Sequence, residues 1–242
     1  MLRPVLIFLT LLITACGGSD GDTIETNSAL DELANERHAS VHFVNTANQS
    51  VDYFVKETDS STPLFDDASK VATNNNDKNE INQHPIRWST PTPLHIDLGI
   101  GDTNTQTGKS EITDVLLNNS DSIWAIAWLD ADQLDGNQLA LSSFTHTPQL
   151  SNQEGMYSVR VFTHTTIDIR AIASYSKTEP TLEKGEISNQ LTVESCSSGL
   201  SFKPGSDSGS DYQSISLCDL DPGKLYLLVT DGNELLIAAE IK

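Results

Sequence analysis

The sequence SIWAIAWL at residues 122–129 decides the fold. Its β-branched and aromatic side chains predict a strand, and no charged residue interrupts it. Trp124, Ile126 and Trp128 have the same parity, so we expect their side chains to lie together on one face, directed into a core. After a turn at 130–136, residues 138–144 are expected to return as the second strand of a hairpin.

This hairpin pattern occurs twice in the chain. Residues 231–239 (DGNELLIAA) match residues 135–143 (DGNQLALSS), and a strand pattern at 224–230 precedes the later copy as 122–129 precedes the earlier one. Because the elements follow the same order in both halves, the sequence predicts two copies of one β unit.

Each copy also begins in the same way. Residues 39–45 and 50–55 alternate apolar and polar side chains at period two, and residues 157–163 and 167–172 repeat this pattern. His42 falls on the polar parity of the first strand, so we expect it to face solvent.

The middle of the first copy carries weaker signals. Further strands are expected at 86–88, 94–98 and 111–116. Pro91 and Pro93, between the first two of these, suit an edge strand or a crossover. Residues 99–109 are expected to form a turn and loop.

No long stretch shows the helical period, so the chain is expected to be all-β and built from antiparallel sandwiches. The expected boundaries are 39–150 for the first β-sandwich domain and 151–242 for the second. The link near 147–152 is short, so we expect the two copies to pack together as a pair.

The N-terminus has the pattern of an export signal. Arg3 supplies a positive start, and the apolar run at 5–13 is shorter than the roughly 20 residues of a permanent membrane helix. The sequence Ile13-Thr14-Ala15-Cys16 resembles the lipobox of bacterial lipoproteins, in which the cysteine carries the lipid.

Several consequences follow from this resemblance. Residues 1–15 are expected to be a signal peptide, and 16–38 a flexible linker anchored to the membrane by acylated Cys16. Gly17 in place of Asp is similar to lipoproteins sorted to the outer membrane, facing either the periplasm or the exterior. The alternative is an ordinary secreted protein cleaved near Ala15, with Cys16 as a free thiol.

Cys196 and Cys218 remain as an even pair, 22 positions apart, in an exported chain. This number and context predict a structural disulfide. The pair lacks the CxxC spacing of a redox motif, and two thiols are too few for a zinc site.

The composition is strongly acidic, with 34 Asp and Glu residues and a formal net charge of −20. Such a surface repels nucleic acid phosphates, so nucleic acid is not an expected partner. The acidity favours either solubility in a salty habitat or attraction of divalent cations.

Two acidic loops resemble calcium sites only in part. Residues 130–137 place Leu134 where the register needs an acid, and no Glu closes the loop. Residues 205–211 are rich in Gly and Ser, which is typical of a surface loop. The sequence therefore predicts no metal site and no cofactor.

Catalytic motifs are also not evident. Residues 205–209 place Asp, not Ser, at the centre of the glycine-flanked pentapeptide, so the elbow of a serine hydrolase is not predicted. The six histidines stand at positions 38, 42, 84, 95, 146 and 164 and form no HExxH motif. Trp88, beside loops and Pro91, is the one expected exposed aromatic platform for a sugar.

The openings of the two copies, SVHFVNTANQSVDYFV at 40–55 and SVRVFTHTTIDIRAI at 158–172, resemble the DUF4397 family, as do the closing hairpins. The resemblance extends over both copies, from about residue 39 to 242, although the Ala-Ser-Pro-Asp turn of the family is replaced in each. It implies two tandem immunoglobulin-like antiparallel β-sandwich domains. The family has no established catalytic residues, so it implies no catalysis.

Together these observations predict a non-enzymatic, lipid-anchored cell-envelope protein. Its two modules are expected to contact a protein, glycan or matrix partner. The alternative is a calcium- or carbohydrate-binding surface module, and an exported hydrolase is a weaker third hypothesis.

Overall fold

The computed structural model describes residues 36–77, 80–103, 108–130, 138–147, 155–173, 176–205, 209, 211–232 and 234–241. These residues form strands, connecting turns and one short 3-10 turn, η1 (Asp67–Ser69), as predicted for an all-β chain. Across this part of the chain, no helix has the length and apolar character needed to cross a bilayer. Residues 35–242 form one compact unit.

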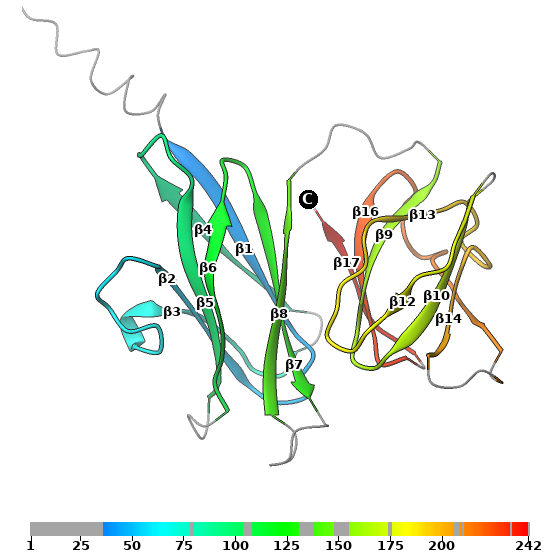
Figure 1. The fold of residues 1–242 in the computed structure, drawn as a ribbon, viewed down its shortest axis with the longest axis horizontal. Helices are drawn as coiled ribbons and strands as arrows, with labels where there is room; N and C mark the ends of the chain where they lie inside the picture. The colour runs from blue at the N-terminus through cyan, green and yellow to red at the C-terminus, as the bar shows by residue number, and fades with distance from the viewer. Residues whose placement is uncertain are drawn as a thin grey trace, which may run out of the picture. The chain divides into compact units, whose positions relative to one another are not determined.

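The first sandwich consists of two four-stranded sheets (Figure 1). One sheet has the order β4 (Ile81–Trp88), β1 (Arg37–Asn45), β7 (Ser122–Asp130) and β8 (Gln138–His146). The other has the order β3 (Lys70–Asn74), β2 (Val51–Glu57), β5 (Leu94–Asp102) and β6 (Ser110–Leu117).

The second sandwich is also built from two sheets. One has the order β13 (Leu191–Val193), β9 (Tyr157–Thr163), β16 (Leu225–Thr230) and β17 (Leu235–Ile241). The other has the order β11 (Ser176–Thr178), β10 (Ile167–Ala173), β14 (Leu200–Pro204) and β15 (Gln213–Ile215), with β12 (Thr181–Leu182) also paired to β10.

The strand orders confirm the predicted duplication. β1, β7 and β8 occupy the same positions in the first sandwich as β9, β16 and β17 in the second. Within each copy one pair is parallel, β1 with β7 and β9 with β16, whereas we expected antiparallel pairing throughout. These partners are joined through the opposite sheet and not by a hairpin, so they can run in the same direction.

Three layers of apolar side chains hold the sheets together. One core lies within each sandwich, and a third cluster joins the β4-β1-β7-β8 sheet to the β13-β9-β16-β17 sheet. We call this third layer the seam. Its fully buried members include Val44, Phe162 and Leu227. The seam agrees with the expectation that the two copies pack together as a pair.

β7 is buried on both faces because it lies between two of these layers. Ile123 and Ala125 point into the core of the first sandwich, whereas Trp124, Ile126 and Trp128 belong to the seam. The prediction that these three side chains share a face is confirmed. We expected this face to lie in the core of the first sandwich, but it packs against the second sandwich.

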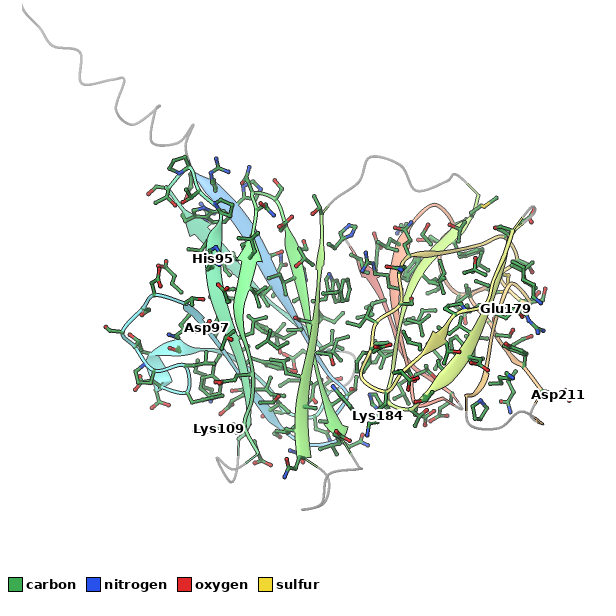
Figure 2. All side chains as sticks on the ribbon, in the orientation of Figure 1. His95, Asp97, Lys109, Glu179, Lys184 and Asp211 are labelled. Carbon is green, nitrogen blue, oxygen red and sulfur yellow. A yellow bond between two sulfur atoms is a disulfide. The ribbon has the colours of Figure 1, made fainter. Side chains whose placement is uncertain are left out.

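Polar contacts also cross the seam. Oγ of Ser142 donates to the carbonyl oxygen of Gly185 at 2.7 Å, and Nζ of Lys184 lies 2.7 Å from Oδ1 of Asp130 (Figure 2 labels Lys184). The ring of Trp128 packs edge-on against Phe162 at 5.8 Å. Directed contacts thus accompany the apolar ones and fix one arrangement of the two sheets.

Several element boundaries differ from those expected. Residues 99–102 belong to β5 and not to a turn, because they pair with residues 51–54 of β2. A Cβ at Gly99 would lie 2.9 Å from Cε1 of Phe65, so the glycine lets the loop between β2 and β3 pack closely on the strand. β1 begins at Arg37, two residues before the predicted boundary. The crossover around Pro91 and Pro93 is confirmed, since β4 and β5 lie in different sheets.

Candidate functional site

A groove in the second sandwich is the main candidate binding site. It has a volume of about 440 Å³ and lies between the strands that end the two sheets, β13 on one side and β11 with β12 on the other. The segment 186–190, which leads into β13, closes one side of it.

Local hydrogen bonds shape this groove. The backbone N–H of Ser188 donates to the carbonyl oxygen of Val161 at 2.8 Å, and the N–H of Val161 donates to Oγ of Ser188 at 2.9 Å. Leu182 and Leu191, each 5% exposed, connect the groove to the core of the second sandwich. The segment is thus held on β9 while its neighbouring side chains remain at the surface.

The groove offers neutral hydrogen-bonding groups. Side chains that line it and form no hydrogen bond within the described chain are Ser176, Thr178, Asn189, Gln190 and Thr192. Glu186 is the charged lining residue, and its Oε2 accepts from the N–H of Glu183 at 3.1 Å. The groove lining contains one charged residue, although the chain as a whole has 34 acidic residues.

The groove also borders two sheet edges. β11 and β13 each stand at the end of their sheet, so part of their backbone N–H and C=O groups is not used within the sheets. Each edge strand is three residues long. The groove therefore combines free side-chain amides and hydroxyls with free backbone groups.

The predicted disulfide is present between Cys196 and Cys218, with Cα atoms 4.7 Å apart. Beside it, the N–H of Leu217 donates to the carbonyl oxygen of Cys196 at 2.7 Å, and Leu217 is fully buried in the core. The bond ties the segment after β13 to the segment before β16. Cys16, the predicted lipidation site, lies outside the described residues.

The prediction that Trp88 is an exposed platform is wrong. Trp88 is only 7% exposed, and its Nε1–H donates to the carbonyl oxygen of Thr92 at 2.9 Å. The crossover after β4 folds back over the ring, and the ring packs into the core of the first sandwich. Trp124 and Trp128 are also buried, so none of the three tryptophans presents a face to a sugar.

The prediction that His42 faces solvent is only partly correct, because the side chain points away from the first core but is partly buried. Its ring stacks on Trp124 with centroids 4.7 Å apart, and its Nε2 lies 3.0 Å from Oγ of Ser40. His42 lies on the face of β1 opposite the first core, and the Trp124 ring covers part of it there. Burial lowers the pKa of His42, and burial likewise lowers those of His84 and His146.

A second cluster of titratable groups lies on the β5 and β6 strands of the first sandwich, where Figure 2 labels His95 and Asp97. Nδ1 of His95 lies 2.5 Å from Oδ1 of Asp114. Burial alone would raise the pKa of Asp97, but the Asp114 N–H at 3.0 Å, the Thr58 hydroxyl at 2.8 Å and the Lys56 ammonium at 3.3 Å lower it.

This second cluster is explained by local structure. Asp114 has a positive φ of 61° at an irregularity in the pairing of β5 with β6, and its N–H donates a hydrogen bond to Oδ1 of Asp97. The ionised Asp97 thus stabilises a bulge at the edge of its sheet. The contacts of the cluster support an architectural role.

The two acidic loops weighed as calcium sites fall largely outside the described residues, which omit 131–137, 206–208 and 210. Asp130, at the start of the first loop, pairs with Lys184. Within the described ranges, no group of three or more His, Cys, Asp or Glu side chains is arranged to hold a metal ion.

No family model matches the chain, and no curated protein matches it at a significant level of similarity. The resemblance to DUF4397 therefore stays a prediction.

Sequence reasoning missed the groove. Its strands β11, β12 and β13 are two or three residues long, too short to show an alternating pattern. The available signal was compositional. Residues 187–193 contain no charged residue, and four of them, Ser188, Asn189, Gln190 and Thr192, are polar, in a chain that is otherwise acidic.

Proposed function

We propose that this chain is a non-enzymatic, lipid-anchored cell-envelope protein whose second sandwich binds an extended segment of a partner protein. The observation that carries the proposal is the groove between the β11 and β13 edges, with its free neutral side chains. Both edges belong to a sandwich that is fixed against the first one, so the groove is presented on a large, preorganised body.

An extended polypeptide suits this site because it can add to an exposed sheet edge. Main-chain hydrogen bonds to the edge supply affinity, and pockets for alternate side chains supply specificity. Three residues of an added strand cover about 10 Å, which matches the length of β11 or β13. Asn189 and Gln190 stand beside the β13 edge and can bond to the same segment.

A polypeptide is favoured over a glycan. Sugar sites use aromatic faces, and the groove lining contains no aromatic residue. The formal net charge of −20 opposes an anionic partner, and Glu186 reinforces this at the groove itself. We therefore expect a neutral or basic segment.

Site-specific photo-crosslinking in the native envelope tests this proposal. A photoreactive residue at Gln190 should crosslink to a polypeptide, identified by mass spectrometry, and a synthetic peptide of that segment should compete. The same residue at Thr113, exposed on β6 of the first sandwich, is the matched control. Equal crosslinking from both positions, or products that contain only glycan, would reject polypeptide binding at the groove.

The anchoring part of the proposal rests on the lipobox-like sequence that ends in Cys16. The two openings similar to DUF4397 support the same class of exported, sandwich-built protein. Mass spectrometry of the mature chain should find an acylated cysteine at its N-terminus, and Cys16→Ser should leave the protein unlipidated. An N-terminus without fatty acid would reject the anchor and leave the groove proposal standing.

A further inference from the structure

The side of the groove formed by β11 and β12 is one edge strand in two pieces. β11 and β12 pair with β10 in a single, unbroken antiparallel register. Between the two pieces, the N–H of Ile169 in β10 donates to the carbonyl oxygen of Pro180 at 2.9 Å, in the same register. Residues 176–182 therefore act as one strand, which we call the long edge. It is more than twice as long as β13, on the opposite side of the groove.

Side-chain contacts between the two strands agree with this register. Nε of Arg170 lies 2.7 Å from Oε1 of Glu179, and the hydroxyl of Thr181 donates to Oδ1 of Asp168 at 2.6 Å (Figure 2 labels Glu179). Residues on the same face of two paired strands make such contacts when they lie opposite each other. The long edge thus continues past Pro180 without an inserted residue.

The hydrogen bonds to β10 determine which backbone groups the long edge leaves unused. In an antiparallel pair, alternate residues bond to the neighbouring strand, and the bond from Ile169 to Pro180 identifies these as the even-numbered residues. The N–H and C=O groups of Lys177, Glu179 and Thr181 therefore point away from β10. No hydrogen bond joins these backbone groups to another described residue, and all three residues are exposed. Pro180 has the inward parity, so its missing N–H does not interrupt the outward row.

β13 offers fewer backbone groups to a bound segment. Ser158 of β9 lies opposite Thr192, and its N–H donates to the carbonyl oxygen of Lys224 at 3.2 Å, on the β16 side. The residues of β13 that bond to β9 are therefore those at 191 and 193, and Thr192 has its backbone groups directed outward. The long edge thus presents three outward residues, and β13 presents one.

We propose that the partner segment of the groove adds to the long edge as the next strand of the β11-β10-β14-β15 sheet. Its backbone bonds to the outward N–H and C=O groups of Lys177, Glu179 and Thr181, and β13 forms the opposite wall. The pairing rests on the proposed polypeptide binding at the groove and specifies where the backbone of the bound segment lies. A segment of about five extended residues spans the outward row.

The position of the added strand also determines the side chains that the segment can carry. Successive side chains of a strand point to opposite faces. Those on one face enter the groove of about 440 Å³, beside Pro180 and Ile187, and those on the other face lie at the surface near Lys177 and Glu179. We therefore expect uncharged side chains on the groove face, and no proline where an N–H of the segment points to the long edge.

Amide hydrogen exchange of the full mature chain, followed by NMR, tests the pairing. The probe is a short peptide that is selected on the chain from a phage-displayed library and shifts the side-chain signals of Gln190. In the free chain, the amides of Lys177, Glu179 and Thr181 should exchange faster than those of Ser176 and Thr178, which bond to β10. The bound peptide should slow the exchange of the three outward amides about tenfold or more.

Two variants make the test specific. Lys177→Pro removes an outward N–H and should weaken peptide binding about fivefold or more, which corresponds to one hydrogen bond. Edge strands tolerate proline where the N–H faces outward. Ser214→Pro is the matched control, because Ser214 is exposed on β15, at the opposite edge of the same sheet, and should leave binding unchanged. N-methylation of the peptide, one residue at a time, should lower its affinity at alternate residues.

The outcomes separate the edge pairing from groove binding. A peptide that shifts the Gln190 signals while the amides of Lys177, Glu179 and Thr181 exchange as in the free chain would overturn the pairing and leave groove binding standing. If no peptide shifts the Gln190 signals, groove binding fails and the pairing fails with it. Slow, concentration-dependent exchange of the three amides without peptide would mean that a second copy occupies the long edge, which also overturns the proposal. If Lys177→Pro does not fold, the exchange of the unmodified chain still decides.

Discussion

Oγ1 of Thr46 lies 2.9 Å from Nε2 of His164, although 118 residues separate them. Both residues directly follow the first strand of their copy, so matching positions of the duplicated unit meet at the seam. The Thr46 hydroxyl donates to the carbonyl oxygen of Ala127 at 2.9 Å. Since a hydroxyl has one hydrogen, Nε2 of His164 carries the proton and donates to Oγ1.

Gly185→Ala should destabilise the protein through the seam. Gly185 has a φ of +78°, and a Cβ there would lie 2.5 Å from Cζ2 of Trp128. Gly223→Ala is the matched control, because Gly223 has a φ of +83° and an added Cβ meets nothing within 4 Å. Both variants should lose about 1 kcal/mol for the left-handed backbone, and Gly185→Ala should lose about 1–3 kcal/mol more from overpacking. Equal urea midpoints for the two variants would contradict a tightly packed seam.

His42→Phe should make the protein less sensitive to mild acid. Burial lowers the pKa of His42 in the folded chain below its ordinary value of about 6.5. Below pH 6.5 the unfolded chain therefore takes up a proton that the folded chain does not, so the free energy of unfolding falls until the folded pKa is reached. Phenylalanine keeps the stacking on Trp124 and removes the titration.

Urea unfolding between pH 7.5 and 5 measures this effect. The free energy of unfolding should fall less steeply for His42→Phe than for the parent chain. Some dependence should remain, because burial also lowers the pKa of His84 and of His146. Identical pH dependence in the two proteins would show that His42 is not held neutral at the seam.

The sequence is sufficient for the duplicated fold because most of its longer strands carry a readable alternation, although β4 (Ile81–Trp88) is predicted only over 86–88. β7, β8, β16 and β17 were all found in this way, and their shared turn sequence exposed the repeat. What alternation cannot show is which side of a strand is covered. The parity of Trp124 is predicted correctly, but its surroundings are not, since the second sandwich covers that face, and the partial burial of His42 follows from its stacking on Trp124.

The candidate groove could not be found in the same way. It forms where two edge strands and a connecting segment meet, and Ser176 and Thr192 approach the same groove only through the pairing of β11 and β13 with different partners. The burial of Trp88 was equally hidden, because it depends on the path of the crossover after β4. The disulfide could be predicted because Cys196 and Cys218 remain as a single pair once Cys16 is assigned to the predicted lipobox.

Removing the disulfide should destabilise the second sandwich without abolishing its fold. The bond links residues 22 positions apart, and a loop of this size corresponds to about 3 kcal/mol in the chain-entropy account. The double variant Cys196→Ser, Cys218→Ser should therefore show a lower urea midpoint than the parent. Adding a reductant should lower the urea midpoint of the parent to a similar value and leave the urea midpoint of the variant unchanged. A parent chain that reductant does not affect would contradict the prediction.

The double variant Asn189→Ala, Gln190→Ala should weaken partner binding without loss of stability. Both side chains are exposed, line the groove and form no hydrogen bond within the described chain, so the folded state does not depend on them. Two neutral hydrogen bonds to a bound segment are worth about 2 kcal/mol, or roughly thirtyfold in Kd. Calorimetry with a peptide of the crosslinked segment measures the loss, and Thr113→Ala, on the first sandwich, is the control. Unchanged affinity in the double variant would place the partner elsewhere, whereas a lowered melting temperature would mean that these side chains support the fold.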